Sequence, residues 1–343
     1  MTFNIPPVST SILEALQQKI DAKIKPIKSL GDLEGIALKI GLIQNTLTPE
    51  LKKPTILVFA ADHGITENNE VTIYPKEATV QMVYNFLNGG AATNIFSKQN
   101  NIELKIVDAG VNYDFGLLPG LVNAKIAYGT QNVLKSPAMS LDQYQQAIAK
   151  GAELVENEFN NESNIIGFGE IGVGNTSSAA LLMAALTNTL IEDCVGAGTG
   201  NNNEQVIKKV EILGRVLDTH FPDTLPKIMA TFGGFEIAMI AGGILKAAEL
   251  KMTVLIDGFV VTSALLFANA INENVMDYCI ICHESSEPGH TKMIDFLKKK
   301  TILNLGIHLG EGVGVALAYP LVESAVNFLN FMTDFKTIKI DNI

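Results

Sequence analysis

The residue with the clearest potential for acid–base chemistry is Glu311, a carboxylate set among glycines at positions 310, 312 and 314. Glycines allow the backbone to approach a ligand closely, and they leave the carboxylate without a neighbouring side chain to pair with. Such a carboxylate can act as a general base. It can equally be an acidic residue near the positive end of the helix that the following Ala, Leu and Val residues predict. The residues alone leave both interpretations open.

A second group of residues could bind a phosphate. Residues 167–172 form a G-x-G-x-x-G pattern after an apolar run, which is typical of dinucleotide-binding turns. Glu170, however, would place a carboxylate beside a pyrophosphate, and polar residues follow at 175–178. We therefore expect a helix that starts near Thr176, with Asn175 or Thr176 as its N-cap and a phosphate cradle at its start. This favours a mononucleotide, while dinucleotide binding and a purely structural turn remain alternatives.

Cysteine and histidine form one literal motif, the C-x-x-C-H of Cys279, Cys282 and His283. Haem attachment requires export, and a redox pair would stand at the start of a helix, whereas these cysteines lie in an apparent strand. Buried thiols are therefore the favoured interpretation. No histidine pair has the spacing of a metal site, so no metal is expected. Asp62 and His63 follow another strand, and we expect them to form a hydrogen-bonded turn at the floor of a ligand site.

Continuous apolar runs alternate with helical patterns along most of the chain, and glycine-rich turns separate them. Such runs are typical of strands that are buried on both faces of a parallel sheet. We predict strands at residues 55–60, 104–108, 164–168, 253–257 and 278–282. We predict helices at residues 78–96, 141–159, 178–190, 204–217, 236–249 and 293–300. This order indicates an α/β fold with a doubly wound, mostly parallel, Rossmann-like sheet, whose loops form a crevice for a polar small molecule.

The two chain ends have a different pattern. Residues 9–45 and 314–332 are predicted to be helical. We expect the ends, residues 1–50 and 305–343, to pack together as a small helical domain beside an α/β nucleotide-binding core at residues 51–304. The segment at residues 5–7, which contains two prolines, is a plausible arm toward a second subunit.

The charge of the chain excludes one large class of function. There are 25 Lys and Arg against 36 Asp and Glu, a net charge of −11, and Arg215 is the only arginine. A protein that reads nucleic acid needs clustered basic residues and arginine forks, so this function is excluded. Any anionic ligand must be bound by backbone amides, helix N-termini and single lysines.

Nothing in the sequence predicts export or a membrane span. The first residues lack the basic and apolar regions of a signal peptide. The apolar part of the longest uncharged stretch, residues 179–186, is far shorter than the about 20 residues that a membrane helix needs. Three cysteines cannot form a disulfide framework. We expect a cytoplasmic protein.

Taken in order, these motifs resemble those of the nicotinate-nucleotide:dimethylbenzimidazole phosphoribosyltransferase family, which makes the lower-ligand nucleotide of cobalamin. The resemblance covers nearly the whole chain. Its motifs lie at residues 61–64, 169–176, 198–200, 233–236, 257–259, 283–289 and 309–312. It implies transfer of a 5-phosphoribosyl group from nicotinate mononucleotide to 5,6-dimethylbenzimidazole or a related base, which gives α-ribazole 5′-phosphate and nicotinate. It implies no cofactor or metal, and a homodimer whose subunits contribute to one another's sites.

The resemblance also assigns roles to individual residues, and Glu311 matches the family's general base. The nucleotide and its phosphate are expected at Glu170, Gly172, Gly174, Asn175, Thr176, Ser177, Gly198, Thr199, Gly200 and Lys209, and the base at Tyr74, Met82, Ser285 and Leu309. Met82 stands where a glutamine can occur in other members, and the neighbouring Gln81 could supply that amide. The alternative function is an NAD(P)-dependent oxidoreductase that uses the glycines of residues 167–172.

Overall fold

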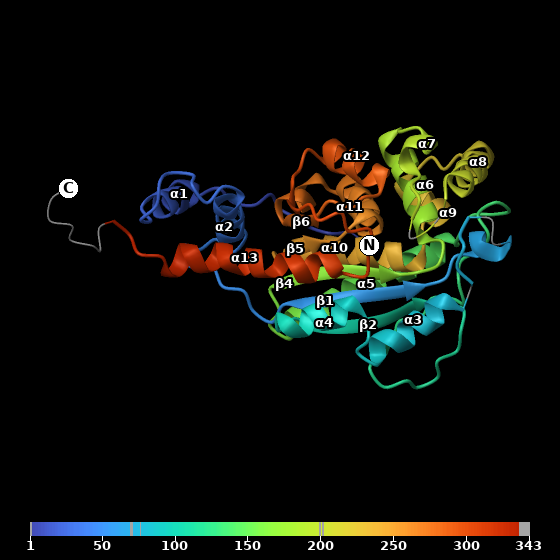
Figure 1. Cartoon of the computed structure of the whole chain (residues 1–343), viewed down its shortest axis with the longest axis horizontal. Coiled ribbons are helices and arrows are strands. Elements are labelled where there is room, and N and C mark those ends of the chain that lie inside the picture. The colour runs from blue at the N-terminus through green and yellow to red at the C-terminus, as the bar shows by residue number, and fades with distance from the viewer. Residues whose placement is uncertain (1, 69–70, 76, 199, 201, 336–343) are drawn as a thin grey trace.

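The computed structural model describes residues 2–68, 71–75, 77–198, 200 and 202–335. At its centre is a seven-stranded parallel sheet with the order β3-β2-β1-β4-β5-β6-β7. The strands are β1 (Thr55–Ala61), β2 (Glu103–Gly110), β3 (Leu121–Asn123), β4 (Ile165–Ile171), β5 (Thr253–Ile256), β6 (Cys279–His283) and β7 (Thr301–Leu303). The chain builds outward from β1 to β3 and then in the other direction from β4 to β7 (Figure 1). The prediction of a doubly wound α/β fold is therefore confirmed.

Helices connect the strands and cover both faces of the sheet (Figure 1). They are α1 (Leu13–Asp21), α2 (Asp32–Ile43), η1 (Gly64–Asn68), α3 (Ala78–Leu87), α4 (Ala92–Gln99), α5 (Leu141–Asn160), α6 (Asn175–Thr187), α7 (Ile191–Cys194), α8 (Asn203–Thr219), α9 (Leu225–Phe232), α10 (Phe235–Glu249), α11 (Phe259–Ile271), η2 (Glu273–Asp277), α12 (Pro288–Leu297) and α13 (Val313–Phe331). One hydrophobic core lies between the sheet and α5, α6, α10 and α11, and a second lies beneath α3, α4 and α13.

The apolar strands follow from this arrangement, because successive side chains of a strand point to opposite faces. In β1, Leu57 and Phe59 belong to the core on the α10 side, whereas Ile56 and Val58 belong to the core on the α13 side. Every residue of β1 is buried. A strand covered on both faces has no solvent-facing positions, so its sequence shows a continuous apolar run.

Several details of the secondary-structure prediction are wrong. The helix predicted at residues 78–96 is two helices, because α3 ends at Leu87 and Gly89 adopts a left-handed φ of 76° before α4. The edge strands β3 and β7 were not predicted, since three residues are too few for a periodic pattern. Helix α11 was also missed, because it is apolar around nearly its whole circumference and has no amphipathic stripe.

The N-terminal and C-terminal helices lie side by side at one end of the molecule (Figure 1). A small hydrophobic core joins Leu16 and Ile20 of α1 to Ala325 and Leu329 of α13. The first half of α13, however, packs against the sheet, so this helix takes part in both cores. The division into a helical domain at residues 1–50 and 305–343 and a core at residues 51–304 stays a prediction.

The segment at residues 5–7 contacts its own chain. Ile5 is buried, its carbonyl accepts a hydrogen bond from Asn274 Nδ2 at 2.9 Å, and the Pro6 carbonyl accepts one from Tyr278 Oη at 2.9 Å. These contacts hold the segment against η2 and the tyrosine that follows it. The interpretation of this segment as an arm toward a second subunit is therefore not supported.

Helix α13 is long and apolar enough, by length and composition, to cross a membrane, and it is the one such helix among the described residues. It is not an uncharged stretch of the sequence, because it contains Glu323. In the fold, 56% of its most apolar window is buried against the sheet and the neighbouring helices. Its apolar composition is thus that of a core helix.

Candidate active site

A cavity of about 320 Å³ lies at the carboxyl end of β4, close to the point where the strand order reverses. Segments that follow β1, β5, β6 and β7, together with the loop after α7, form its other walls, in the position where parallel α/β sheets bind ligands. The expected site residues that line it are Tyr74, Met82, Glu170, Gly172, Gly174, Asn175, Thr176, Gly198, Gly200, Ser285, Leu309 and Glu311. Ser177 and Lys209 are buried behind this lining, and Thr199 lies outside the described residues.

The turn that carries Glu311 is held from several directions. Glu311 has a φ of 69°, a left-handed conformation that non-glycine residues seldom adopt. Its carbonyl accepts a hydrogen bond from Thr93 Oγ1 at 2.9 Å. The amides of Gly312 and Gly314 donate to the two carboxylate oxygens of Asp257, at 2.9 Å and 2.7 Å. Because Asp257 is fully buried directly after β5, it fixes the turn to the sheet.

The surroundings of Glu311 favour an acid–base role. Burial raises the pKa of its carboxyl to about 7, and the Asp257 carboxylate adds to the shift. A carboxyl whose pKa lies near the working pH is well placed to take up a proton during a reaction. The capping interpretation does not fit, because α13 begins at Val313 and has no acidic residue in its first turn.

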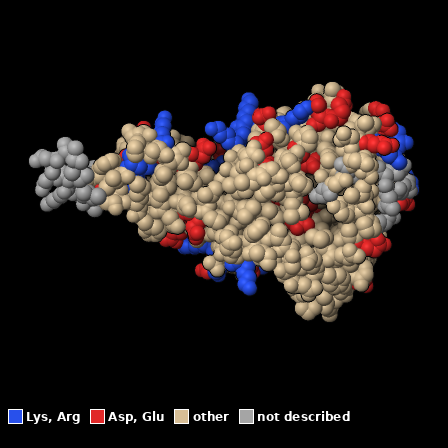
Figure 2. Space-filling model, viewed as in Figure 1, with Lys and Arg blue, Asp and Glu red and all other residues tan. Residues whose placement is uncertain are grey.

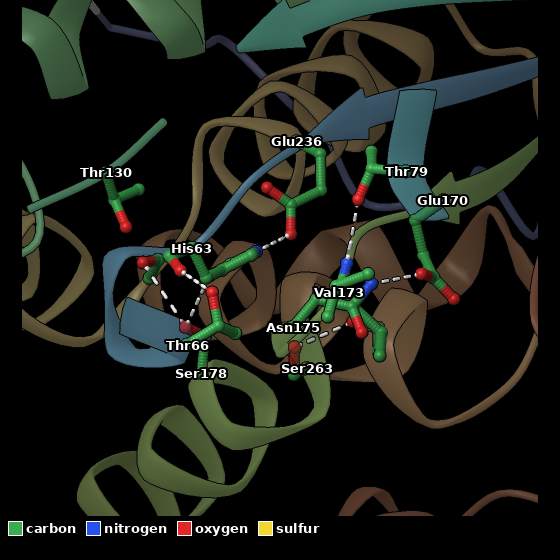
Figure 3. A network of polar contacts seen from close by, with 12 residues as sticks. His63, Thr66, Thr79, Thr130, Glu170, Val173, Asn175, Ser178, Glu236 and Ser263 are labelled. Carbon is green, nitrogen blue, oxygen red and sulfur yellow. Dashed lines mark hydrogen bonds and ion pairs between the residues drawn. The ribbon is translucent and has the colours of Figure 1, made fainter. Parts of the chain in front are cut away.

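Glu170 lies at the end of β4, where its carboxyl accepts a hydrogen bond from Asn175 Nδ2 (Figure 3). Burial raises the pKa of Glu170 well above its ordinary value, and the carboxylates of Asp257, Glu236 and Glu311 raise it further. These surroundings favour the protonated form of the Glu170 carboxyl. Because a protonated carboxyl carries no negative charge, the raised pKa weakens the objection that the sequence raised to a phosphate beside Glu170.

The start of α6, which is the predicted phosphate cradle, lines the cavity, but its cap was predicted wrongly. The N-cap is Gly174, with a φ of 91°, and the helix begins at Asn175. The Asn175 side chain does not cap the helix because it bonds to Glu170. The amide of Val173 is taken by Thr79 Oγ1, at 3.2 Å. Among the described residues, no hydrogen-bond partner is found for the amides of Gly174 and Thr176, and these two donors remain for an anion.

Lys209 supports this cradle from α8. Its ammonium donates to Thr176 Oγ1 at 2.8 Å, so it lies behind the Thr176 hydroxyl and not in the cavity itself. Burial lowers the pKa of Lys209 to about 8, while the Glu287 carboxylate opposes the shift. A phosphate bound on the other side of Thr176 would favour the charged ammonium. Glu287 and His308 also line the cavity, and sequence reasoning assigned no role to either.

The residues expected to contact the base lie together on the cavity wall. Tyr74, Met82, Ser285 and Leu309 all line the cavity, whereas the neighbouring Gln81 is exposed and does not. The expectation that Gln81 supplies an amide is therefore not supported. The Ser285 amide donates to His290 Nδ1 at 2.8 Å, and burial lowers the pKa of His290 to about 3. This neutral imidazole acts as an acceptor that fixes the loop after β6.

Below the cavity, His63 joins two helices in a buried polar network (Figure 3). Its Nε2 lies 2.6 Å from Glu236 Oε1, and its Nδ1 lies 3.0 Å from Ser178 Oγ. Burial lowers the pKa of His63, but the Glu236 carboxylate outweighs burial and leaves that pKa raised. Asp62 accepts a hydrogen bond from the Asn112 amide at 2.8 Å. Both residues are hydrogen-bonded as predicted, but neither lines the cavity, so their predicted place at its floor is not shown. No cluster of metal-ligand residues is found in the described part of the chain.

The glycines of the G-x-G-x-x-G pattern serve packing. Gly167 and Gly169 lie inside β4 and not in a turn after it. A Cβ on Gly167 would lie 2.4 Å from Val315 Cγ1, and one on Gly169 would lie 2.4 Å from the Glu311 carbonyl carbon. The glycines thus let α13 and the Glu311 turn lie against the strand. The dinucleotide interpretation of this pattern is wrong.

The C-x-x-C-H motif also has a structural explanation. Cys279 and Cys282 lie in β6 as free, buried thiols. Burial raises the pKa of Cys279 to about 12 and that of Cys282 well above its ordinary value. Neither thiol carries the thiolate that redox chemistry or metal binding requires. The prediction of buried thiols is confirmed.

The fold and this cavity define an α/β protein with a ligand-sized cavity at the carboxyl ends of its strands, beside two backbone amides at the start of α6 that have no partner among the described residues. A family model described as phosphoribosyltransferase matches residues 5–340. The nicotinate-nucleotide–dimethylbenzimidazole phosphoribosyltransferase of Aromatoleum aromaticum is 46% identical over all of this chain and 99% of its own length. The enzyme of the same name from Cupriavidus taiwanensis is 48% identical over 96% of both chains. A crystal structure of CobT from Thermus thermophilus has a TM-score of 0.91 at 35% identity, and covers 95% of this chain and 97% of its own.

The chain belongs to the nicotinate-nucleotide–dimethylbenzimidazole phosphoribosyltransferase family. This confirms the resemblance stated from the sequence motifs, and the assignment of the chain as a phosphoribosyltransferase in cobalamin biosynthesis. The alternative of an NAD(P)-dependent oxidoreductase is not supported by any of these relatives.

Proposed function

We propose that the enzyme transfers the 5-phosphoribosyl group of nicotinate mononucleotide to 5,6-dimethylbenzimidazole or a related base. The products are α-ribazole 5′-phosphate and nicotinate, in assembly of the cobalamin nucleotide loop. The observation that carries the proposal is the position of Glu311, whose pKa of about 7 suits a general base and which shares one cavity with the phosphate cradle.

The proposed step needs one base and two well-placed substrates. A ring nitrogen of the benzimidazole attacks the anomeric carbon as the bond to the pyridinium nitrogen breaks, with inversion. The bonding electrons go to the departing nicotinate nitrogen, which becomes neutral. The other ring nitrogen of the acceptor loses its proton, and ionised Glu311 takes it. Holding both substrates in line can lower the barrier by about 7–11 kcal/mol.

The cavity offers a separate position for each substrate. The amides of Gly174 and Thr176 are placed to bind the phosphate at the start of α6, with Lys209 behind them. Tyr74 and Met82 provide a less polar wall for a flat aromatic base. In its protonated form, which the raised pKa favours, Glu170 can donate a hydrogen bond to the nucleotide without repelling its phosphate.

The direct test is product formation. Purified enzyme is incubated with nicotinate mononucleotide and an equimolar mixture of dimethylbenzimidazole, benzimidazole, adenine and phenol, and products are separated by mass. We expect ribazole phosphate as the main product. Nicotinate release without a ribazole product, or no turnover at all, would contradict the proposal. Product ratios give the base preference directly.

Lys209→Ala is expected to weaken binding of nicotinate mononucleotide by about tenfold or more. The substitution removes a buried cation that orients the Thr176 hydroxyl, and bonds to charged groups contribute about 1.5–3 kcal/mol. Isothermal titration calorimetry measures the change, and Lys208→Ala on the exposed side of α8 is the matched control. An unchanged dissociation constant for Lys209→Ala would remove Lys209 from the phosphate site.

We propose that the enzyme is a homodimer and that it works in the cytoplasm. Support for an interface comes from an exposed apolar patch beside the sheet edge: Tyr84, Tyr113, Leu117 and Tyr128 are 37%, 43%, 102% and 58% exposed. Patches of this kind mark protein contacts. A reducing compartment suits the three free, buried cysteines, and fractionation of cells tests it.

Leu117→Asp is expected to shift the protein from dimer to monomer. A carboxylate at the centre of an apolar interface would lose its hydration without gaining a partner. Analytical ultracentrifugation over a range of concentrations measures the change. Phe221→Asp is the control, because Phe221 is 83% exposed and lies outside the patch. A Leu117→Asp variant that remains dimeric would place the interface elsewhere.

A further inference from the structure

A second cavity, of about 360 Å³, lies between α2 and the amino ends of β6 and β7, at the edge of the sheet away from the catalytic loops. We call it the α2 groove. Its walls are mainly aliphatic side chains, contributed by α2, β6, β7 and α13. These are Leu33, Ile36, Ile280, Ile302 and Leu321. None of these residues belongs to the catalytic cavity.

Positive charge surrounds this apolar groove. Lys39, Lys299 and Lys300 line it, whereas Asp32 is the only acidic lining residue in the part of the chain that the structure describes. Asp32 is 3.9 Å from Lys300, and both side chains are highly exposed. In a chain with a net charge of −11, such a concentration of lysines is unusual. Figure 2 shows basic side chains on this face, over the region between α2 and α12.

The deepest of these cations is Lys39. Its ammonium donates one hydrogen bond, to the Met276 carbonyl at 2.9 Å, and no second partner is found among the described residues. An ammonium has three donors, so two remain for a ligand in the groove. Lys39 therefore offers an anchor for an anion beside the aliphatic walls of the groove.

We propose that the α2 groove binds a carboxylate with an apolar body, such as a medium-chain fatty acid. The aliphatic walls cover the hydrocarbon, and the carboxylate pairs with Lys39 and Lys299. The proposal is independent of the phosphoribosyl transfer, because the groove shares no lining residue with the catalytic cavity.

Binding is linked to a proton on Lys39. Burial lowers the pKa of Lys39 to about 8; the Cys279 and Asp277 side chains oppose the shift, and Lys299 adds to it. The Cys279 thiol stays protonated, since its pKa is raised to about 12. A bound carboxylate stabilises the charged ammonium, so binding takes up a proton above pH 8. Affinity is therefore highest below pH 8 and falls as the pH rises through it.

Gly35 provides a variant that fills the groove without harming the fold. Gly35 lines the groove inside α2, and a Cβ there would meet no atom within 4 Å. Gly35→Leu places an isobutyl group in the open space. Leucine is also a better helix former than glycine, so the melting temperature should stay equal or rise.

The test is calorimetric titration of the full chain with octanoate and, separately, with octylammonium. We expect saturable binding of octanoate at one site, no binding of octylammonium, loss of octanoate binding in Gly35→Leu and about tenfold weaker binding in Lys39→Met. Lys227→Met, at an exposed lysine of α9, should bind as the unmodified protein does. Proton uptake, measured in buffers of different ionisation enthalpy, should disappear in Lys39→Met. The absence of saturable binding, or equal binding by Gly35→Leu, would overturn the proposal.

Discussion

Glu311→Gln is expected to lower kcat by about 10²–10⁴-fold, the range over which a positioned general base accelerates a reaction. Glutamine keeps the size of the side chain but cannot take the proton from the acceptor ring. The turn itself depends on Thr93 and Asp257, which bond to its backbone, so its geometry should survive. Binding of nicotinate mononucleotide should change by less than about threefold, since the phosphate cradle lies on α6.

The pH dependence of the unmodified enzyme follows from the same carboxyl. Glu311 must be ionised to act, and its pKa is about 7. We expect kcat/KM to fall about tenfold per pH unit below pH 7 and to level off above it. The residual kcat/KM of Glu311→Gln should not show this fall below pH 7.

Stability should change in the opposite direction to activity. A folded-state pKa of about 7 against an ordinary 4.5 means that the folded protein binds this proton more tightly than the unfolded chain does. Between pH 4.5 and pH 7 the unfolded chain releases this proton more readily than the folded protein does. The free energy of unfolding therefore falls by about 3 kcal/mol over this pH range. Glutamine carries no such cost, so Glu311→Gln should be more stable than the unmodified enzyme at pH 8 and gain less at pH 5.

These expectations are separable by three measurements. Turnover and nucleotide affinity are measured at pH 8, and thermal unfolding at pH 5 and pH 8. Glu14→Gln, at an exposed position of α1, is the control for the loss of a carboxylate. Near-normal turnover of Glu311→Gln would assign the proton transfer to another group, and an equal stability gain at both pH values would contradict the raised pKa.

The fold could be predicted from the sequence wherever a structural feature is encoded by residues that are neighbours in the chain. Strands buried on both faces leave an apolar run in the sequence, and the glycine-rich turns that follow such runs mark the ligand-binding edge of the sheet. The edge strands β3 and β7 left no such signal, because they are short and half-buried. The break between α3 and α4 was signalled by consecutive glycines at residues 89 and 90, whose effect the surrounding helical pattern concealed.

The site was predictable in its residues but not in their connections. Glu311 and the cradle at residues 172–176 stand out by composition, and they line one cavity. Asp257 accepts hydrogen bonds from Gly312 and Gly314 of the Glu311 turn, which lie 55 and 57 positions later in the chain. No local sequence pattern encodes contacts over such a separation. The one signal of this contact in the sequence is that Asp257, an acidic residue, directly follows the buried strand β5. Lys209 acts through Thr176 and not on the cavity surface, a distinction that only the three-dimensional arrangement reveals.

Gly169→Ala is expected to reduce both activity and stability, although alanine usually strengthens a strand relative to glycine by about 0.5–1 kcal/mol. A Cβ at this position would lie 2.4 Å from the Glu311 carbonyl carbon and 2.5 Å from the Gly312 nitrogen. Backbone atoms cannot rotate away as a side chain can. The Glu311 turn is also bonded to Thr93 and Asp257, so it has little freedom to retreat.

The added methyl group must therefore displace the turn that carries the proposed base. A shift of about 1 Å at a reacting group can cost about 10²-fold in rate, and overpacking in a core costs about 1–3 kcal/mol. We expect Gly169→Ala to lower the turnover rate by about 10²-fold and the free energy of unfolding by about 1–3 kcal/mol. Its affinity for the nucleotide should be retained. Gly214→Ala on α8 is the matched control, because a Cβ there meets no atom within 4 Å and should be neutral or slightly stabilising. Full turnover by Gly169→Ala would show that the turn tolerates displacement, and that the close approach of β4 does not position Glu311.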